Sequence, residues 1–243
     1  MTAAEAAVLW HDLECGGYAE DLPLWRELAA AAGPGATVLD VGAGTGRVTL
    51  HLARRGTPVV ALDADARLLA ALERRASGLP VRTAAADARS FDLGERFALI
   101  IVPMQTVQLL EGPAGRAAFL RCARGHLRPG GRLVLALADA LDCFDEEHDQ
   151  PPVPDVADVD GVVYFSRPVA VRDEGGRVAL ERIRQTVDRQ GRRTAEGDVV
   201  RLDRVEAATL EEEARAAGLR VLPRRSIPQT DEYVGSDVVV LGA

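Results

Sequence analysis

The chain has 243 residues, of which 47% are hydrophobic and 27% are charged, and its mean hydropathy is −0.01. This length and balance favour one globular α/β domain with an insert, and they exclude a disordered or fibrous chain. The net charge of −8 argues against binding of nucleic acid through its phosphates, because such binding depends on a basic surface.

Two helices are predicted ahead of the core, because apolar residues recur at helical spacing over residues 3–14 and 22–32. The N-terminal stretch carries acids where a signal peptide carries positive charge. No apolar run reaches the ~18 residues that a membrane span needs. We therefore expect a cytoplasmic protein that does not bind a membrane.

After Gly33-Pro34-Gly35, short β-branched runs alternate with helical stretches, which is the pattern of a parallel sheet built from βα units. Strands are predicted at 37–41, 58–62, 80–84, 97–102 and 132–137, and helices at 45–55, 65–76 and 114–127. The last of these helices is expected to stop at Arg128-Pro129-Gly130-Gly131.

The second half of the chain predicts an insert followed by a return to the core. Residues 139–160 are acidic and proline-rich, which predicts a mobile loop. An antiparallel hairpin is predicted at 161–173 and 177–188, with a candidate third strand at 197–205, then a helix at 207–217 and strands near 219–226 and 233–241. The expected parts are a core at 1–140, an insert at 141–205 and a C-terminal segment at 206–243.

Residues 38–50 read VLDVGAGTGRVTL, a buried strand that is followed by three alternate glycines and a helix. Such a turn needs positive φ, and a side chain there would block a ligand pressed against the backbone. The dinucleotide fingerprint GxGxxG would need a glycine where this chain has Arg47 or Thr49. All 29 basic residues are arginine, so Schiff-base catalysis and a P-loop nucleotide site, which need lysine, are also excluded.

Three carboxylates come at the ends of three successive predicted strands. Asp40 suits a ligand with a positive or hydrogen-donating group, such as the ammonium group of S-adenosylmethionine, and it repels a pyrophosphate. Asp63 can accept both hydroxyls of a ribose, and Asp87 can accept from an adenine amine. Each acid alone is commonly a helix cap or a turn residue, but their joint order predicts one nucleoside site.

The segments VLDVGAGTG, VVALD, AAD and HLRPGGRLVLAL resemble the ordered motifs of class I S-adenosylmethionine-dependent methyltransferases. The resemblance covers about residues 18–140 and resumes in the C-terminal helix and strands. It implies a Rossmann-like methyltransferase fold of the α/β class, with a mostly parallel seven-stranded sheet and an antiparallel β insert after the fifth strand. The insert is similar to that of small-molecule N-methyltransferases, including those that act on sugar amines.

The resemblance also implies the cofactor S-adenosylmethionine, the product S-adenosylhomocysteine and a set of binding residues. YAEDLPLW at 18–25 resembles a subgroup in which such a tyrosine closes over the methionine end of the cofactor. The predicted cofactor-binding residues are Tyr18, Asp40, Gly42, Ala43, Gly44, Asp63, Ala64, Asp87, Ala88 and Pro103.

The exit of the fourth strand, VPMQTVQLL at 102–110, is expected to face the transferred methyl group, because ligands lie beyond the carboxyl ends of such strands. It does not match the acid or asparagine, two prolines and an aromatic residue that mark enzymes acting on exocyclic base nitrogens and glutamine amides. The candidate substrate residues are Met104, Gln105, Gln108 and Tyr164. Packing, for Met104, and a solvated helix face, for the two glutamines, remain alternatives.

An amine acceptor needs only to be neutral, whereas a hydroxyl acceptor gains from a general base, for which His11, His148 or a nearby carboxylate are the candidates. No metal site is expected. The acidic run at 145–149 is interpreted as a solvated loop, with a divalent-metal site as the less favoured alternative.

We therefore expect methyl transfer to N or O of a small metabolite, with the insert as a substrate cover or a homodimer interface. Two alternatives stay open: a non-methylating use of the same cofactor, such as cyclisation, and a non-catalytic module that binds the cofactor or a partner subunit.

Overall fold

The computed structural model describes residues 2–138, 142–147, 152–230 and 233–243. Its first part contains α1 (Ala3–Cys15), α2 (Leu22–Ala31), β1 (Val38–Val41), α3 (Arg47–Ala53), β2 (Val59–Asp63), α4 (Ala66–Arg75), β3 (Val81–Ala85), β4 (Phe97–Val102), the 3-10 helix η1 (Thr106–Leu109), α5 (Pro113–Gly125) and β5 (Leu127–Leu137). Its second part contains β6 (Phe144–Asp145), β7 (Asp155–Val159), β8 (Val162–Asp173), β9 (Arg177–Val187), β10 (Arg193–Asp203), α6 (Ala207–Ala216), β11 (Arg220–Ile227) and β12 (Ser236–Gly242).

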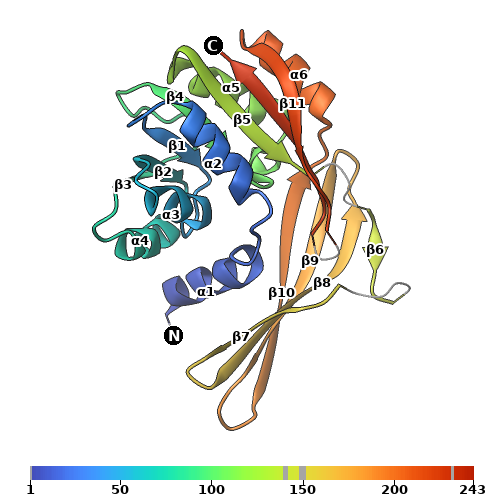
Figure 1. Cartoon of the computed structure of the whole chain (residues 1–243). Helices are drawn as coiled ribbons and strands as arrows, with labels where there is room; N and C mark the ends of the chain where they lie inside the picture. Colours follow the sequence, from blue (N-terminus) through green and yellow to red (C-terminus); the bar gives the residue numbers. More distant parts are fainter. Residues whose placement is uncertain (1, 139–141, 148–151, 231–232) are drawn as a thin grey trace.

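The main sheet has seven strands in the order β11-β12-β5-β4-β1-β2-β3 (Figure 1). The five strands from β5 to β3 are parallel, whereas β12 runs antiparallel to both β5 and β11. This arrangement confirms the predicted Rossmann-like methyltransferase fold. Because parallel strands point the same way, the carboxyl ends of β1, β2 and β4 meet at one edge of the sheet.

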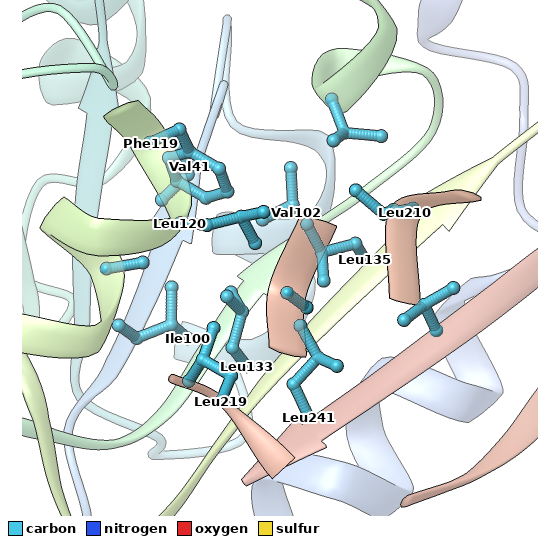
Figure 2. Close-up of a cluster of buried hydrophobic side chains, with 14 of the residues drawn as sticks. Val41, Ile100, Val102, Phe119, Leu120, Leu133, Leu135, Leu210, Leu219 and Leu241 are labelled. Atoms are coloured by element: carbon cyan, nitrogen blue, oxygen red, sulfur yellow. The ribbon is translucent and has the colours of Figure 1, made fainter. Parts of the chain in front are cut away.

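Both faces of this sheet are covered by helices. Figure 2 shows one face, where Phe119 and Leu120 of α5 and Leu210 of α6 pack with Val41 and Val102 of the central strands, all five side chains being fully buried. Helices α2 and α3 cover the opposite face with residues that include Trp25, Leu28 and Leu52. The strand ends are thus held by a rigid, three-layered core.

The insert forms a second sheet in the order β10-β9-β8-β6, with β7 also paired to β8. The hairpin of β8 and β9 and the third strand β10 confirm the predicted antiparallel insert. The prediction of a mobile loop at 139–160 was wrong where the structure describes this segment, because β6 and β7 both pair with β8, with Ala157 of β7 opposite Tyr164. Residues 139–141 and 148–151 lie outside the described residues. The two-residue turn Asp160-Gly161, with φ angles of 53° and 73°, joins β7 to β8 as a tight hairpin. Asp-Gly is a local signal of such a turn, so this strand was missed because the acidic, proline-rich composition was given more weight.

The boundary between α5 and β5 also differs from the prediction. Helix α5 ends at Gly125, and β5 already begins at Leu127, so the segment Arg128-Pro129-Gly130-Gly131 lies within this strand. None of the helices in the described part of the chain is both long and apolar enough to cross a membrane.

Helix α1 lies between the main sheet and the insert (Figure 1). On the insert side, the Trp10 ring packs edge-on against Tyr164 of β8, with ring centroids 5.6 Å apart. Glu14 accepts hydrogen bonds from Arg184 Nε of β9 and from Ser166 Oγ of β8, both at 2.7 Å. On its other side α1 contacts α4. The helix therefore links the insert to the region where β1 and β2 end.

Candidate functional site

Asp40 lies near the end of β1 and is almost completely buried, with 1% of its surface exposed. Its Oδ2 accepts a hydrogen bond from Thr49 Oγ1 at 2.6 Å, whereas its Oδ1 is buried without a hydrogen-bond partner among the described residues. Burial raises the pKa of Asp40 to about 6. An unsatisfied buried carboxylate oxygen is costly, so this position suits a ligand group that donates a hydrogen bond or carries positive charge.

Asp63 ends β2 and fastens the glycine loop to it. Its Oδ2 accepts from the backbone N–H of Gly44, and its Oδ1 accepts from the N–H of Asp65, both at 2.8 Å. A carboxylate oxygen can accept more than one hydrogen bond, so Asp63 can also accept from a ligand hydroxyl. The acid is thus both a support of the loop and a candidate ligand contact.

The glycines of the loop make room for side chains of the chain itself. Gly42 and Gly44 have φ angles of 73° and 55°, which side-chain-bearing residues rarely adopt. A Cβ at Gly42 would overlap the Thr106 side chain, and a Cβ at Gly44 would overlap the His11 ring. The expectation was that a side chain here would block a ligand; the structure adds that it would also displace α1 and η1 residues.

A buried ion pair fixes the tyrosine that was predicted to close over the cofactor. Arg47 donates to both oxygens of Asp21, at 2.5 and 2.7 Å, and to the backbone oxygen of Tyr18 at 2.7 Å. Its guanidinium lies over the Tyr18 ring, 5.1 Å from the centroid. The Tyr233 ring also packs against the Tyr18 ring, with the two centroids 5.0 Å apart. Tyr18 is thus held between an arginine and a second tyrosine.

The remaining predicted cofactor residues lie at the ends of strands or in the loops that follow. Ala43 is buried within the glycine loop, and Pro103 is buried directly after β4. Ala64 is exposed, and Ala88 is half-buried after β3. Asp87 is exposed and pairs with Arg89 at 2.7 Å, and hydrogen bonds from Arg89 lower the pKa of its carboxyl group.

The candidate substrate residues lie in different parts of the structure. Met104 and Gln105 are half-buried at the exit of β4, and Met104 has a φ of 55°, which is uncommon for a residue with a side chain. Tyr164 lies on the insert and is buried against Trp10.

Gln108 lies in a structural junction and not on a solvated face, with 2% of its surface exposed. Its side-chain nitrogen donates to the backbone oxygens of Ala138 and Asp203, and its oxygen accepts from the N–H of Ala138 at 3.0 Å. These bonds engage its amide in joining η1 to β5 and β10, so we leave Gln108 out of the proposed substrate site.

Of the two base candidates, His11 lies on α1 beside Gly44, and His148 lies outside the described residues. The neighbouring acids that the sequence offered as metal ligands pair with arginines: Asp145 with Arg172 at 2.9 Å and Glu146 with Arg167 at 2.6 Å. Within the described ranges, no three histidine, cysteine or acidic side chains gather as a metal would require.

Three residues of this site were not predicted, namely Asp12, Asp21 and Thr45. The ion pair of Arg47 with Asp21 was not predicted either. Thr45 Oγ1 donates to Asp12 Oδ1 at 2.7 Å, which fastens α1 to the glycine loop. The two residues are 33 positions apart. A contact at that separation has no local signature in the sequence.

Known proteins that resemble this chain include several methyltransferases. Residues 38–131 match a family model described as a methyltransferase domain. The cypemycin N-terminal methyltransferase of Streptomyces sp is 35% identical over 111 residues, which are 46% of this chain and 43% of that protein. The chain spans less than half the length of the curated relatives that it matches.

Two solved structures share the whole fold. The amino pentose methyltransferase CalS10 from Micromonospora echinaspora is 24% identical, with a TM-score of 0.71 over 100% of this chain and 97% of that one. The sugar N-methyltransferase KedS8 from Streptoalloteichus sp is 22% identical, with a TM-score of 0.73 over 96% of this chain and 91% of that one. Residues 38–131 therefore match a methyltransferase domain, and the chain has the Rossmann-like methyltransferase fold.

Proposed function

We propose that this protein binds S-adenosylmethionine at the carboxyl edge of β1, β2 and β4 and transfers its methyl group to a nitrogen of a small molecule, with an oxygen acceptor as the second choice. The observation that carries the proposal is the buried carboxylate of Asp40, whose Oδ1 has no hydrogen-bond partner among the described residues. It lies next to a glycine loop that Asp63 holds in place.

The chemistry of the residues fits this cofactor group by group. Asp40 would meet the ammonium group, and burial of an opposite charge beside it would make their attraction strong. Asp63 would accept from the ribose, and Asp87 from the adenine amine, for which it would share its oxygens with Arg89. Tyr18, supported by Arg47, would cover the methionine end. Ala43, Ala64, Ala88 and Pro103 would line the same path.

When bound, S-adenosylmethionine supplies a methyl group on a positively charged sulfur. The chain then has to align the acceptor atom and keep water out, which is a positioning task and needs no protein nucleophile. Met104 and Gln105, at the exit of β4, and Tyr164 on the insert are our candidates for contacts to the acceptor. His148 remains our candidate base for a hydroxyl acceptor.

An amine on a small molecule is our first choice of acceptor for two reasons. KedS8 and CalS10 are described as methyltransferases of a sugar nitrogen and of an amino pentose, and we take over this substrate class as a proposal. The net charge of −8 attracts cationic amines and repels nucleic acid. We also propose a cytoplasmic location, and an insert that covers the substrate or joins two copies of the chain through an exposed strand edge.

The test is a product assay with S-adenosylmethionine and a panel of amino sugars, each paired with its hydroxyl analogue. We expect methylated amine and S-adenosylhomocysteine in equal amounts, and loss of both in Asp63→Ala but not in Asp92→Ala, whose surface carboxylate is 90% exposed. Turnover without S-adenosylhomocysteine would indicate the non-methylating alternative. Cofactor binding without turnover of any acceptor would favour the non-catalytic module.

A further inference from the structure

His11 occupies a position beside the cofactor loop that neither the family match nor the strand-end acids account for. Its imidazole edge, Nε2 and Cε1, lies against Gly44, so close that no side chain fits between them. The residue is on α1, far from the exit of β4 in the chain, and it is half-buried. Its ring therefore faces the proposed nucleoside site and not the exit where the acceptor would bind.

The hydrogen bonds around His11 determine which ring nitrogen carries the proton. Thr45 Oγ1 lies 2.7 Å from Asp12 Oδ1, and since a carboxylate only accepts, the hydroxyl proton points to Asp12. Thr45 Oγ1 must then accept from His11 Nδ1, which is 3.2 Å away. With its proton on Nδ1, the neutral ring presents a lone pair on Nε2, next to Gly44.

The surroundings favour this neutral form. Burial lowers the pKa of His11; Asp12 and Glu14 of α1 and Asp63 of β2 oppose that shift, and Arg75 of α4 adds to it. Arg75 also donates to Asp12 Oδ1 at 2.9 Å. This ion pair partly neutralises the Asp12 carboxylate, which therefore stabilises a protonated His11 less. Among the described residues, His11 makes its hydrogen bond through Nδ1 and makes none through Nε2, so the lone pair of Nε2 is available to a ligand.

We propose that His11 is a cofactor-binding residue, whose unprotonated Nε2 accepts a hydrogen bond from one ribose hydroxyl of the bound nucleoside while Asp63 accepts from the other. The inference rests on the proposed function, because it needs a nucleoside at this loop. It assigns His11 to the cofactor, in place of the base role predicted from the sequence. On this proposal, the contacts of Thr45, Asp12 and Arg75 hold the imidazole of His11 in one tautomer.

Two variants separate ligand binding from the docking of α1. A glutamine at position 11 can place an oxygen where Nε2 stands, whereas an asparagine can replace only the Nδ1 contact to Thr45. For S-adenosylhomocysteine measured by calorimetry, we expect His11→Gln to bind within about twofold of the unchanged protein, and His11→Asn about three- to tenfold more weakly, as loss of one neutral hydrogen bond implies. The melting temperatures should follow the opposite order.

Analogues of the ligand that lack one hydroxyl complete the test. The 2′-deoxy and 3′-deoxy analogues of S-adenosylhomocysteine each lack one of the two hydroxyls. With the analogue that lacks the hydroxyl bound to His11, His11→Asn should cause no further loss, because that bond is already missing; with the other analogue the loss should remain. Equal losses with all three ligands would overturn the inference. So would a reversed order of the two variants, which is what a purely structural role of His11 predicts.

A measurement on the unchanged protein avoids any folding defect in a variant. The chain has four histidines, so proton–nitrogen correlation spectra can be assigned to each ring. We expect Nδ1 of His11 to be protonated, and the Nε2 resonance to shift on addition of S-adenosylhomocysteine. An unchanged Nε2 resonance at saturation would overturn the inference alone. Absence of any binding would overturn it together with the proposed function.

Discussion

Arg47 and Asp21 form a bidentate ion pair inside the protein, with 11% of the arginine side chain and none of the aspartate side chain exposed. The indole N–H of Trp25 donates to the same carboxylate at 2.7 Å. The pair joins the start of α2 to the start of α3. Arg47 also donates to the backbone oxygen of Tyr18, which holds this residue in place. It connects the stability of the core with the shape of the proposed cofactor site.

We expect Arg47→Met to lower the free energy of unfolding by about 3 kcal/mol, because it leaves Asp21 buried without its charge partner. Adding Asp21→Asn should recover part of this loss. Arg26→Met, which changes an exposed arginine of α2, is the control and should stay within about 0.5 kcal/mol. Urea unfolding followed by circular dichroism measures all three, and an Arg47 variant as stable as the control would contradict the role of the pair.

The buried carboxyl of Asp40 predicts a stability that depends on pH. Its pKa of about 6 lies above the ordinary value of 3.8, so the stability that the protonated form contributes is lost as pH rises from about 4 through 6. Asp40→Asn avoids this loss and can still accept from Thr49. We expect the variant to gain in melting temperature relative to the unchanged protein as pH rises from 4 to 7.5.

The same substitution should weaken binding of S-adenosylmethionine, because the neutral amide cannot attract its ammonium group. A stability difference that does not vary between pH 4 and 7.5, measured by calorimetric melting in matched ionic strength, would show that burial does not perturb Asp40. Unchanged affinity would remove Asp40 from the ammonium site.

The two glutamines after β4 provide a matched pair with opposite expectations. Gln108→Leu should lower the free energy of unfolding by about 1–3 kcal/mol, because it leaves buried backbone groups of Ala138 and Asp203 without partners. It should leave the affinity for S-adenosylhomocysteine unchanged. Gln105→Leu should leave stability nearly unchanged and raise KM for the acceptor. Kinetics and urea unfolding on the same preparations test both, and the reverse pattern would exchange their roles.

Much of the main sheet was predictable because its signals are local. Alternation of β-branched runs with helical spacing located the strands to within a few residues, apart from the start of β5, and the glycine loop with Asp40 marked the ligand edge. The antiparallel hairpin followed from Glu174-Gly175-Gly176 between two alternating runs. Each of these features lies within one turn or one element of the chain.

Most of the features that were missed depend on contacts between distant positions. Gln108 is structural because its amide donates to the backbone oxygen of Asp203, 95 positions later. β7 is different, because it pairs with β8 across the local turn Asp160-Gly161. In the sequence, Arg47 served only to exclude the dinucleotide fingerprint GxGxxG. Its ion pair could not be predicted, because its partner Asp21 comes 26 positions earlier. Local propensity and motif spacing carry no information about such pairings.

The most direct test of the account is calorimetric titration of the protein with S-adenosylmethionine and S-adenosylhomocysteine, with Asp63→Ala and Asp92→Ala as the paired variants. The account predicts micromolar binding of both ligands, no change in Asp92→Ala, and a loss of about 2 kcal/mol or more, roughly thirtyfold in affinity, in Asp63→Ala. If the folded protein binds neither ligand, or if Asp63→Ala binds as tightly as Asp92→Ala, the proposed nucleoside site is contradicted.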